Sequence, residues 1–259
     1  MRQLSLPVVL ALLSACRPAT PPAEQSAVPV DPAKTTVAPA PVVATGAAPP
    51  ATSSPASAEL DPSRGHETGM VFEAYLSPFQ EPDEEANTPS GTPKVFRSTT
   101  PSKTRAERAA DGHGGHGRLR FSKDLSRVLI DVRIAGVKPE TINMFHIHCG
   151  KPGILGPILV DFAVATNLQE NLADGLFSVE IRNEHIVGTT HQGHGALGAF
   201  TQGCLIPSPT LLPGKPPKVS TVAGMAQLAR DGELYFNLHT TGHTFFGDIR
   251  GQIHAASAQ

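Results

Sequence analysis

Short stretches in which every second residue is apolar recur along most of the chain, separated by glycine and proline. In the clearest of them, residues 127–134, the side chains of Val128, Ile130, Val132 and Ile134 would share one face of an extended strand. Further strands are predicted at residues 69–76, 118–122, 144–149, 157–162, 176–181, 233–240 and 246–254, and one short helix at 222–229. Many short strands with almost no helical periodicity predict an all-β domain, either an antiparallel sandwich or a small barrel.

The start of the chain resembles a bacterial secretory signal. Arg2 precedes an apolar run at residues 4–13, which is shorter than the about 20 residues that a membrane-spanning helix needs. The Leu-Ser-Ala-Cys sequence at residues 13–16 resembles the lipobox of bacterial lipoproteins. We therefore expect residues 1–15 to be a signal peptide and Cys16 to carry the lipid. The alternative is an ordinary signal peptide with an incidental cysteine.

Residues 16–58 are dominated by Pro, Ala, Thr, Ser and Val, without a periodic apolar pattern. Such a segment cannot bury enough apolar surface to offset the entropy lost on ordering. We therefore expect a disordered linker between the lipidated cysteine and a single β domain at residues 59–259. Because Arg17, and not Asp, follows the cysteine, we expect the protein at the outer membrane, facing the periplasm or the cell surface.

The composition narrows the classes of partner. The chain has a net charge of −2 at pH 7 with neutral histidines, so it lacks the basic surface of a nucleic-acid-binding protein. It contains no Trp and only two Tyr, which argues against an aromatic surface for carbohydrate. We therefore expect the membrane, a metal ion or a protein as partners, and no nucleic acid.

Two histidines lie in the apolar strand predicted at residues 144–149. His146 and His148 are two positions apart, so their imidazoles would stand on one face with their backbones about 7 Å apart. Neutral imidazoles at this spacing can share one copper or zinc ion, and His239 on another predicted strand is the candidate third ligand. The alternative is that the three imidazoles bond to backbone or carboxylate groups and hold the strands in register.

Cys149 and Cys204 are the two cysteines left if Cys16 carries lipid. In an exported protein, a disulfide between them is the default expectation. The alternative is that Cys149 is a thiolate ligand beside the histidines, although its side chain should point to the face opposite that of His148.

Three polar segments are predicted to be loops. Residues 83–111 are rich in Pro, Thr, Ser and charged residues, and we expect a mobile surface excursion. Residues 112–117 and 190–195 combine glycine with histidine, which predicts flexible loops with weak capture of copper, nickel or zinc. The histidines of these two loops are His113, His116, His191 and His194.

Several segments together resemble the CHRD domain, a module named after chordin and common in exported bacterial proteins. They are residues 72–82, the His-x-His strand followed by residues 158–161, and residues 232–240 and 247–253. The resemblance implies a Greek-key β-sandwich or barrel in which the strand of His146 approaches the strand of His239. The family has no generally agreed biochemical activity. Relative to its compact form, residues 83–111 and 190–217 are long insertions.

A weaker likeness is to copper/zinc superoxide dismutase, which binds copper through a His-x-His strand of an antiparallel barrel. This likeness would make His146, His148 and His239 copper ligands, but the chain has no clear match to that family's bridging histidine or zinc-ligand loop. We therefore expect a non-enzymatic, lipid-anchored envelope protein without catalytic residues, which binds a transition metal or a protein partner. A copper-dependent oxidoreductase of the superoxide dismutase type and a structural or adhesive module are the alternatives.

Overall fold

The computed structural model of the protein describes residues 62–191, 203–205 and 218–257. The expected signal peptide, the lipidation site at Cys16 and the expected linker lie outside the described residues, as does most of the 190–217 insertion. None of the helices in the described ranges is long and apolar enough to cross a membrane.

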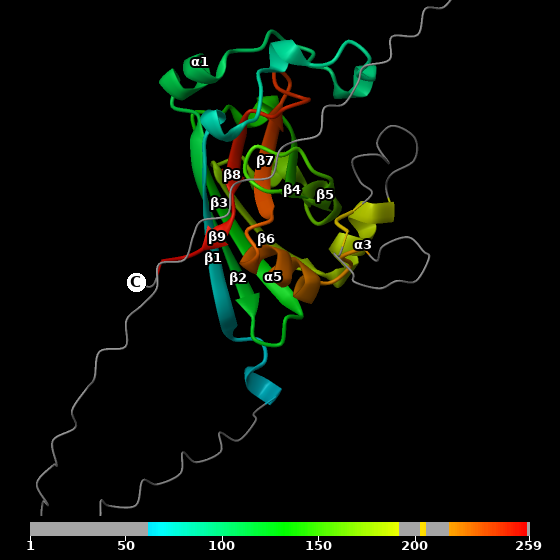
Figure 1. The fold of residues 1–259 in the computed structure, drawn as a ribbon. Coiled ribbons are helices and arrows are strands. Elements are labelled where there is room, and N and C mark those ends of the chain that lie inside the picture. The colour runs from blue at the N-terminus through cyan, green and yellow to red at the C-terminus, as the bar shows by residue number, and fades with distance from the viewer. Residues whose placement is uncertain (1–61, 192–202, 206–217, 258–259) are drawn as a thin grey trace, which may run out of the picture. The chain divides into compact units, whose positions relative to one another are not determined.

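Two antiparallel sheets pack face to face, so the predicted all-β sandwich is confirmed (Figure 1). One sheet has the strand order β6-β3-β2-β1-β9, with β1 Thr68–Leu76, β2 Gly114–Ser122, β3 Arg127–Ala135, β6 Leu176–Arg182 and β9 His254–Ala255. The other has the order β5-β4-β7-β8, with β4 Ile142–Cys149, β5 Ile158–Asp161, β7 Leu234–Thr240 and β8 Ile249–Gln252. Strand β6 pairs with β3, although β4 and β5, which lie between them in sequence, belong to the other sheet.

The stretch predicted as one strand at residues 246–254 is instead divided between the two sheets. Strand β8 pairs with β7, whereas β9 pairs with β1 of the opposite sheet. The chain changes sheets at Ile253, whose side chain is buried and whose N–H donates to the Leu234 carbonyl at 2.9 Å. A buried apolar side chain at this position fixes the crossing point, which alternation alone does not reveal.

The core between the sheets is built from the apolar face of each strand. On β3, alternate residues are buried, as the sequence predicted. Phe145 of β4 packs against Phe162 and Phe177 at ring-centroid distances of 4.9 and 5.2 Å. Burial of each such side chain stabilises the fold by about 1.5–3 kcal/mol. Because Phe145 and Ile147 point into this core, the residues that alternate with them on β4 point to the outer face of the four-stranded sheet.

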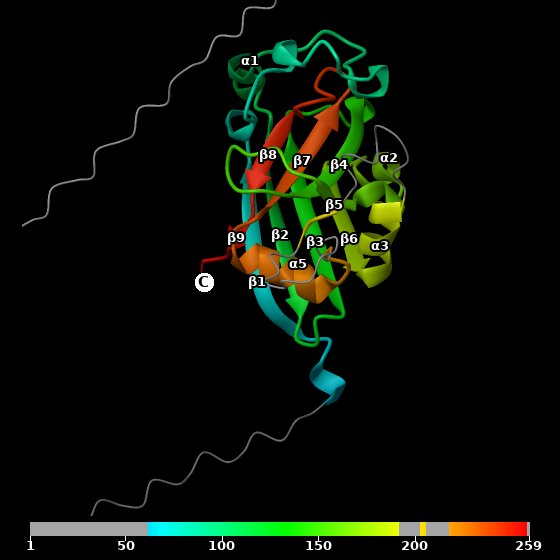
Figure 2. The same cartoon turned by 45° about the vertical axis from the view of Figure 1, so that its right-hand side comes forward.

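Short helices cover the ends and one side of the sandwich (Figure 2). They are α2 Leu168–Asn171, α3 Asn183–His191 and α5 Val222–Arg230, with 3-10 turns at Pro62–Arg64, Pro139–Thr141 and Phe162–Val164. The predicted helix at residues 222–229 is confirmed by α5. The hydroxyl of Thr221 accepts a hydrogen bond from the Gly224 N–H at 3.1 Å, which caps the first turn.

Residues 83–111, which we call the strap, cross the end of the four-stranded sheet (Figure 2). The strap contains two 3-10 turns, Glu85–Asn87 and Lys94–Phe96, and helix α1, Arg105–Ala110. Most strap residues are exposed, as predicted for a surface excursion, and its mobility stays a prediction, but buried contacts tie it to the loop between β7 and β8. Buried Arg108 donates to the Gly247 carbonyl at 2.9 Å and also to the carbonyl of Asp248.

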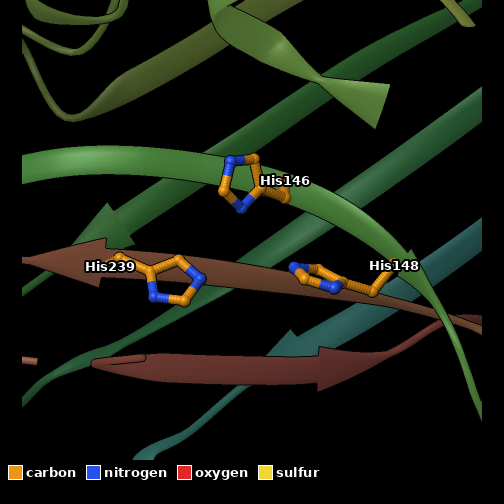
Figure 3. A group of neighbouring side chains, drawn as sticks. All are labelled: His146, His148 and His239. Carbon is orange, nitrogen blue, oxygen red and sulfur yellow. The ribbon is translucent and has the colours of Figure 1, made fainter. Parts of the chain in front are cut away.

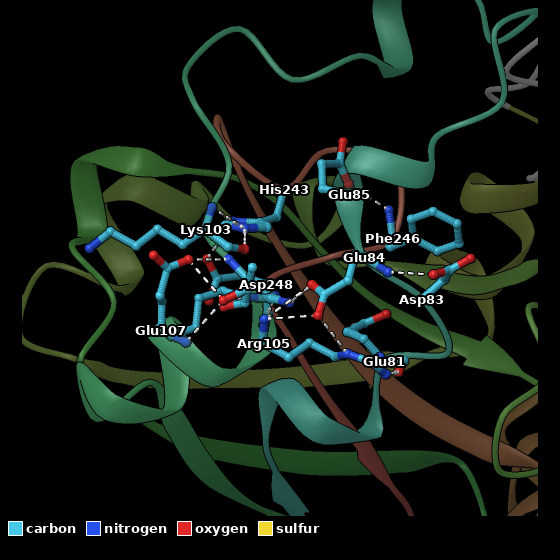
Figure 4. A network of polar contacts seen from close by, with 12 residues as sticks. Glu81, Asp83, Glu84, Glu85, Lys103, Arg105, Glu107, His243, Phe246 and Asp248 are labelled. Carbon is cyan, nitrogen blue, oxygen red and sulfur yellow. Dashed lines mark hydrogen bonds and ion pairs between the residues drawn. The ribbon is translucent and has the colours of Figure 1, made fainter.

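A buried carboxylate makes the second attachment of the strap. Glu85 accepts hydrogen bonds from the Phe246 N–H at 3.0 Å, from the Phe245 N–H at 3.1 Å and from the Ser98 hydroxyl at 2.6 Å (Figure 4). Strap side chains also pair with one another, as Arg105 does with Glu84 at 3.1 Å. Glu85 or Arg108 without its hydrogen-bond partners would destabilise the fold by several kcal/mol, so the bonds of these two residues hold the strap in one place.

The glycine-histidine segment at residues 112–117 is also not a loop. Strand β2 begins at Gly114 and pairs with β1 on one side and β3 on the other. A Cβ at Gly117 would lie 2.8 Å from the ring of Phe236, so this glycine allows close packing between the sheets. Most of the second such segment, residues 190–195, lies outside the described residues.

Candidate metal centre

The structure brings His146, His148 and His239 together on the outer face of the four-stranded sheet (Figure 3). The first two lie on β4 and the third on β7, which pair antiparallel, with Met144 opposite His239. The His146 ring centroid lies 5.3 Å from that of His148 and 5.3 Å from that of His239, and the latter two are 6.3 Å apart. One ring nitrogen from each residue lies within 4.8 Å of the others, so a single ion can reach all three.

A backbone carbonyl orients the imidazole of His148. Its Nδ1 lies 2.9 Å from the carbonyl oxygen of Gly156, which can only accept, so Nδ1 carries the proton and Nε2 the lone pair. Among the described residues, nothing hydrogen-bonds to that Nε2. This arrangement, with one nitrogen donating to a carbonyl and the other free, is the usual one for a metal-bound histidine.

The other two imidazoles also have ring nitrogens without partners. Nε2 of His146 lies 3.7 Å from Oδ1 of Asp161, which is too long for a hydrogen bond, and its Nδ1 has no partner in the described part of the chain. Within the same part, neither nitrogen of His239 makes a hydrogen bond of good geometry, although backbone groups of His243 and Thr244 lie near this ring. Buried polar atoms in folded proteins are almost always hydrogen-bonded to protein or to water, so four such nitrogens in one cluster could be satisfied by an ion or by water.

The protonation state of the three imidazoles suits a metal. Burial lowers the pKa of His148 to about 3 and that of His239 to about 4, the second against the opposing charge of Glu85. Burial, together with the other two imidazoles, holds the pKa of His146 well below its usual range. All three are therefore neutral at neutral pH, which is the form that binds metal.

A cavity of about 50 Å³ lies between the imidazoles and the segments that cover them. Its other walls are mostly apolar: Phe96 of the strap, Phe245 of the β7–β8 loop, and Met144 and Ile158 of the sheet, with Thr244 as the one polar residue among them. The volume holds an ion and one water molecule, since a single water needs about 10–15 Å³. The site is therefore small and lined by imidazole nitrogens among mostly apolar side chains.

Strand β7 supplies a support beneath the site. The ring of Tyr235 stacks on the imidazole of His148, and its hydroxyl accepts from the Gly156 N–H at 3.1 Å. The guanidinium carbon of Arg250 lies 3.4 Å from the centroid of the same ring. Arg250 also donates to the Ile154 carbonyl at 3.0 Å, so the loop after β4 is fixed from two sides. Neither residue was predicted to belong to the site, although strand alternation places Tyr235 on the same face as His239.

The structure joins Cys149 and Cys204 in a disulfide with Cα atoms 5.9 Å apart, as predicted. The bond consumes the thiol of Cys149, which removes this residue from the candidate ligands. The side chain of Cys149 packs against the hydrophobic core, on the face of β4 opposite His148.

The glycine-histidine residues that the structure describes lie in other environments. His113 donates from Nδ1 to Oδ1 of Asp248 at 2.6 Å. Nε2 of His116 lies 3.1 Å from Oε2 of Glu73, on the five-stranded sheet. The side chains of His191 and His194 are outside what the structure describes, so their predicted weak metal capture stays a prediction.

Comparison with protein families gives one match, the model of the CHRD domain, over residues 96–253. Comparisons with curated proteins and with solved structures found no significant match. The matched region contains most of the strands of the sandwich, all three clustered histidines and the later part of the strap. The matched residues make up more than half of the chain, and the chain therefore belongs to the CHRD domain family.

Proposed function

We propose that this CHRD domain binds one zinc or copper ion through His146, His148 and His239. The observation that supports the proposal is the set of four buried ring nitrogens that lack a hydrogen-bond partner among the described residues. Without a ligand, each such nitrogen would cost about 1–3 kcal/mol of desolvation energy. Coordination to a bound ion would satisfy these nitrogens and remove this desolvation cost.

The donor set favours zinc and copper over other biological cations. Imidazole nitrogen is a ligand of intermediate softness, whereas calcium and magnesium prefer carboxylate and carbonyl oxygen. Three imidazoles with one remaining position for water is a common arrangement for zinc. The carboxylate of Asp161 lies 3.7 Å from Nε2 of His146, and a small approach would let it accept a hydrogen bond from Nε2–H, which leaves Nδ1 as the ligand atom.

Binding without turnover is the role that the cover of the site favours. Phe96 and Phe245 line the small cavity beside the histidines, and Glu85 holds the loop that carries the second of these rings. A catalyst of the superoxide dismutase type needs an open metal position that its substrate can reach. A copper-dependent oxidoreductase and a structural or adhesive module are the alternative functions, and the experiments below distinguish them from metal binding without turnover.

The proposed setting is the cell envelope, with the domain anchored through a lipid on Cys16 and exported by residues 1–15. The Leu-Ser-Ala-Cys sequence supports this proposal. The variant Cys16→Ser should lose acylation and move to the soluble fraction. Metabolic labelling with a fatty acid, followed by fractionation, tests it. A variant that stays acylated and membrane-bound would remove the lipid-anchor proposal.

Metal binding is tested on protein purified from the periplasm without a histidine tag. Metal analysis should find close to one zinc or copper per chain, and calorimetry on the metal-free protein should give one site. Replacing any of the three histidines with Ala should weaken binding by about a hundredfold or more, because each supplies a coordination bond. The matched control is His116→Ala, which removes a half-exposed imidazole from the other sheet.

Three results separate the alternatives. Equal affinity in wild type and His146→Ala would reject the site and leave the histidines a structural role. Rapid turnover of superoxide by the copper-loaded protein, lost in His146→Ala, would favour the oxidoreductase. Absence of both metal and turnover would favour a structural or adhesive module.

A further inference from the structure

A methionine shares the cavity of the three clustered histidines. Met144 lies two positions before His146 on β4, so the two side chains stand on the same face of the strand. It is also directly opposite His239 of β7. Opposite residues of two antiparallel strands have Cβ atoms about 4.5–5.5 Å apart. The side chain of Met144 accordingly lines the cavity of about 50 Å³ together with the three imidazoles.

This methionine brings sulfur to the cavity. Among the described residues that line it, Met144 is the only one with a sulfur atom. The thiol of Cys149 is consumed in the disulfide with Cys204 and packs on the opposite face of β4. A methionine side chain has three rotatable bonds, and that of Met144 is half-buried, so its sulfur can adjust to an ion that the buried imidazoles hold.

The groups that line the cavity are all neutral. They are three imidazoles, a thioether and a hydroxyl among apolar side chains, with no carboxylate or thiolate. The carboxylate of Glu85, whose charge acts on His239, is engaged by backbone N–H groups of the β7–β8 loop. The cost of moving an ion out of water into apolar surroundings rises with the square of its charge. Neutral ligands in such surroundings therefore favour a monovalent ion over a divalent one.

A water molecule bound to the ion would find few hydrogen-bond partners in this cavity. The polar side chain of the lining besides the imidazoles is that of Thr244. Its hydroxyl already donates to the Thr240 carbonyl at 3.1 Å and accepts from Nδ2 of Asn143 at 3.2 Å. Zinc bound by three histidines usually keeps a water in its fourth position. A thioether in that position completes the coordination without water.

We propose that the ion selected by this site is copper(I), bound by the three imidazoles and by the sulfur of Met144. The inference rests on the proposed metal site and names the ion that this site prefers. A thioether is a soft ligand, which copper(I) favours. Zinc sites in proteins are built instead from thiolate, imidazole and carboxylate. Imidazole suits either metal, so the methionine decides between them.

The test is a competition for copper(I) between full-length, metal-free protein and the chelator bicinchoninate, without oxygen and with ascorbate as reductant. Zinc affinity is measured separately by calorimetry. Met144→Leu keeps the volume and apolar character of the side chain, so the fold should tolerate it. The variant should bind copper(I) about tenfold more weakly or worse, and zinc as wild type does. In wild type, NMR of the methionine methyl groups should show the Met144 signal moving when copper(I) is added.

The matched control is Met70→Leu, which changes another half-buried methionine, on β1 of the other sheet. Its affinities for both metals should equal those of wild type. Unchanged copper(I) affinity in Met144→Leu would overturn the inference and leave the three-histidine site standing. An equal loss of zinc and copper(I) affinity would also overturn it, because the methionine would then only support the shape of the pocket. Wild-type protein that binds neither metal would reject the metal site itself.

Discussion

The phenol ring of Tyr235 lies parallel to the imidazole of His148, with ring centroids 5.0 Å apart and ring planes within 10°. The tyrosine hydroxyl and the imidazole bond to the same residue of the loop after β4, one to its N–H and the other to its carbonyl. The orientation of this candidate ligand is therefore set by a ring and a loop that do not themselves contact the ion.

Tyr235→Phe should lower the affinity for zinc or copper. The change keeps the stacked ring but removes the acceptor for the Gly156 N–H, so the carbonyl that orients His148 is held less firmly. Loss of such an outer contact weakens metal binding by about tenfold or more. Calorimetry measures the effect, and Tyr75→Phe is the control, because Tyr75 is 58% exposed on the other sheet. Equal affinities of the two variants would contradict this account.

Acid should destabilise the metal-free domain through the buried histidines. The folded pKa of His239, about 4, lies below its unfolded value near 6.5, so its contribution to stability is complete above pH 6.5 and is lost as the pH falls toward 4. Between pH 7.5 and pH 5 this histidine alone should remove about 2 kcal/mol.

The measurement is urea unfolding of wild type and His239→Gln in the presence of a chelator. The variant lacks the titrating group, so the difference in unfolding free energy between the two proteins should change by the same amount over this pH range. A difference that stays constant from pH 7.5 to pH 5 would show that the imidazole is not buried in the neutral form.

Glu81→Gln should stabilise the domain at pH 8. Burial raises the pKa of Glu81 to about 8, against the charges of Arg250 and Arg108, and in the described structure both its oxygens lack hydrogen-bond partners. Because the pKa of Glu81 is higher in the folded than in the unfolded chain, its contribution to the free energy of unfolding is fully present below the unfolded pKa near 4.5. This contribution is lost as the pH rises through the folded pKa near 8. Glutamine resembles the protonated acid, so it should gain on the order of 3 kcal/mol relative to wild type between pH 5 and pH 8.

Chemical unfolding at pH 5 and pH 8 tests this expectation. Glu170→Gln, an exposed change on α2, is the control and should track wild type at both values. The interpretation fails if Glu81→Gln is less stable than wild type at pH 8, because the carboxylate would then be an ionised partner of the two arginines.

Cys204→Ser should lower stability without abolishing the fold. The disulfide closes a loop of 55 residues, which corresponds to roughly 4 kcal/mol if the effect comes from the entropy of the unfolded chain. The two-sheet core is large enough to fold without it. Thermal unfolding with and without a reductant should give a lower melting temperature for the reduced wild type and the variant alike. A reductant that leaves the wild-type transition unchanged would show that the bond does not form.

The sequence predicts some features of the candidate ligands but not others. Period-two alternation in β4 is enough to place His146 and His148 on one face, because strand geometry leaves no other arrangement. The addition of His239 needed the family resemblance, since no local pattern shows which strand pairs with β4. The depth at which the three imidazoles are buried was not predictable. It depends on Phe96, from a segment predicted as a surface excursion, and on Phe245, which lies between two predicted strands.

The buried attachment of the strap was not predicted, for a physical reason. Its composition is polar, and polar segments are usually solvated, but Glu85 and Arg108 are buried against backbone groups of the β7–β8 loop. Those partners lie 161 and 139 residues away in sequence, so no local window contains them. Glycine caused the other error, because Gly117 could indicate either a flexible loop or close packing. Only the position of Phe236 decides between the two.

The strap also imposes an order on folding. It precedes β4 and β7 in the chain, yet its bonds to Phe245 and Phe246 span 160 and 161 residues. The pairing of β4 with β7 joins residues that are closer in sequence, so its loop-closure entropy is smaller, and we expect the four-stranded sheet to form before the strap docks on it. The histidine pocket is then complete but uncovered during the last stage of folding, and an ion present at that moment would be enclosed when the strap docks. The identity of the bound ion would then depend on the metals available in the compartment where the chain folds, and the protein could retain that ion after moving to another compartment.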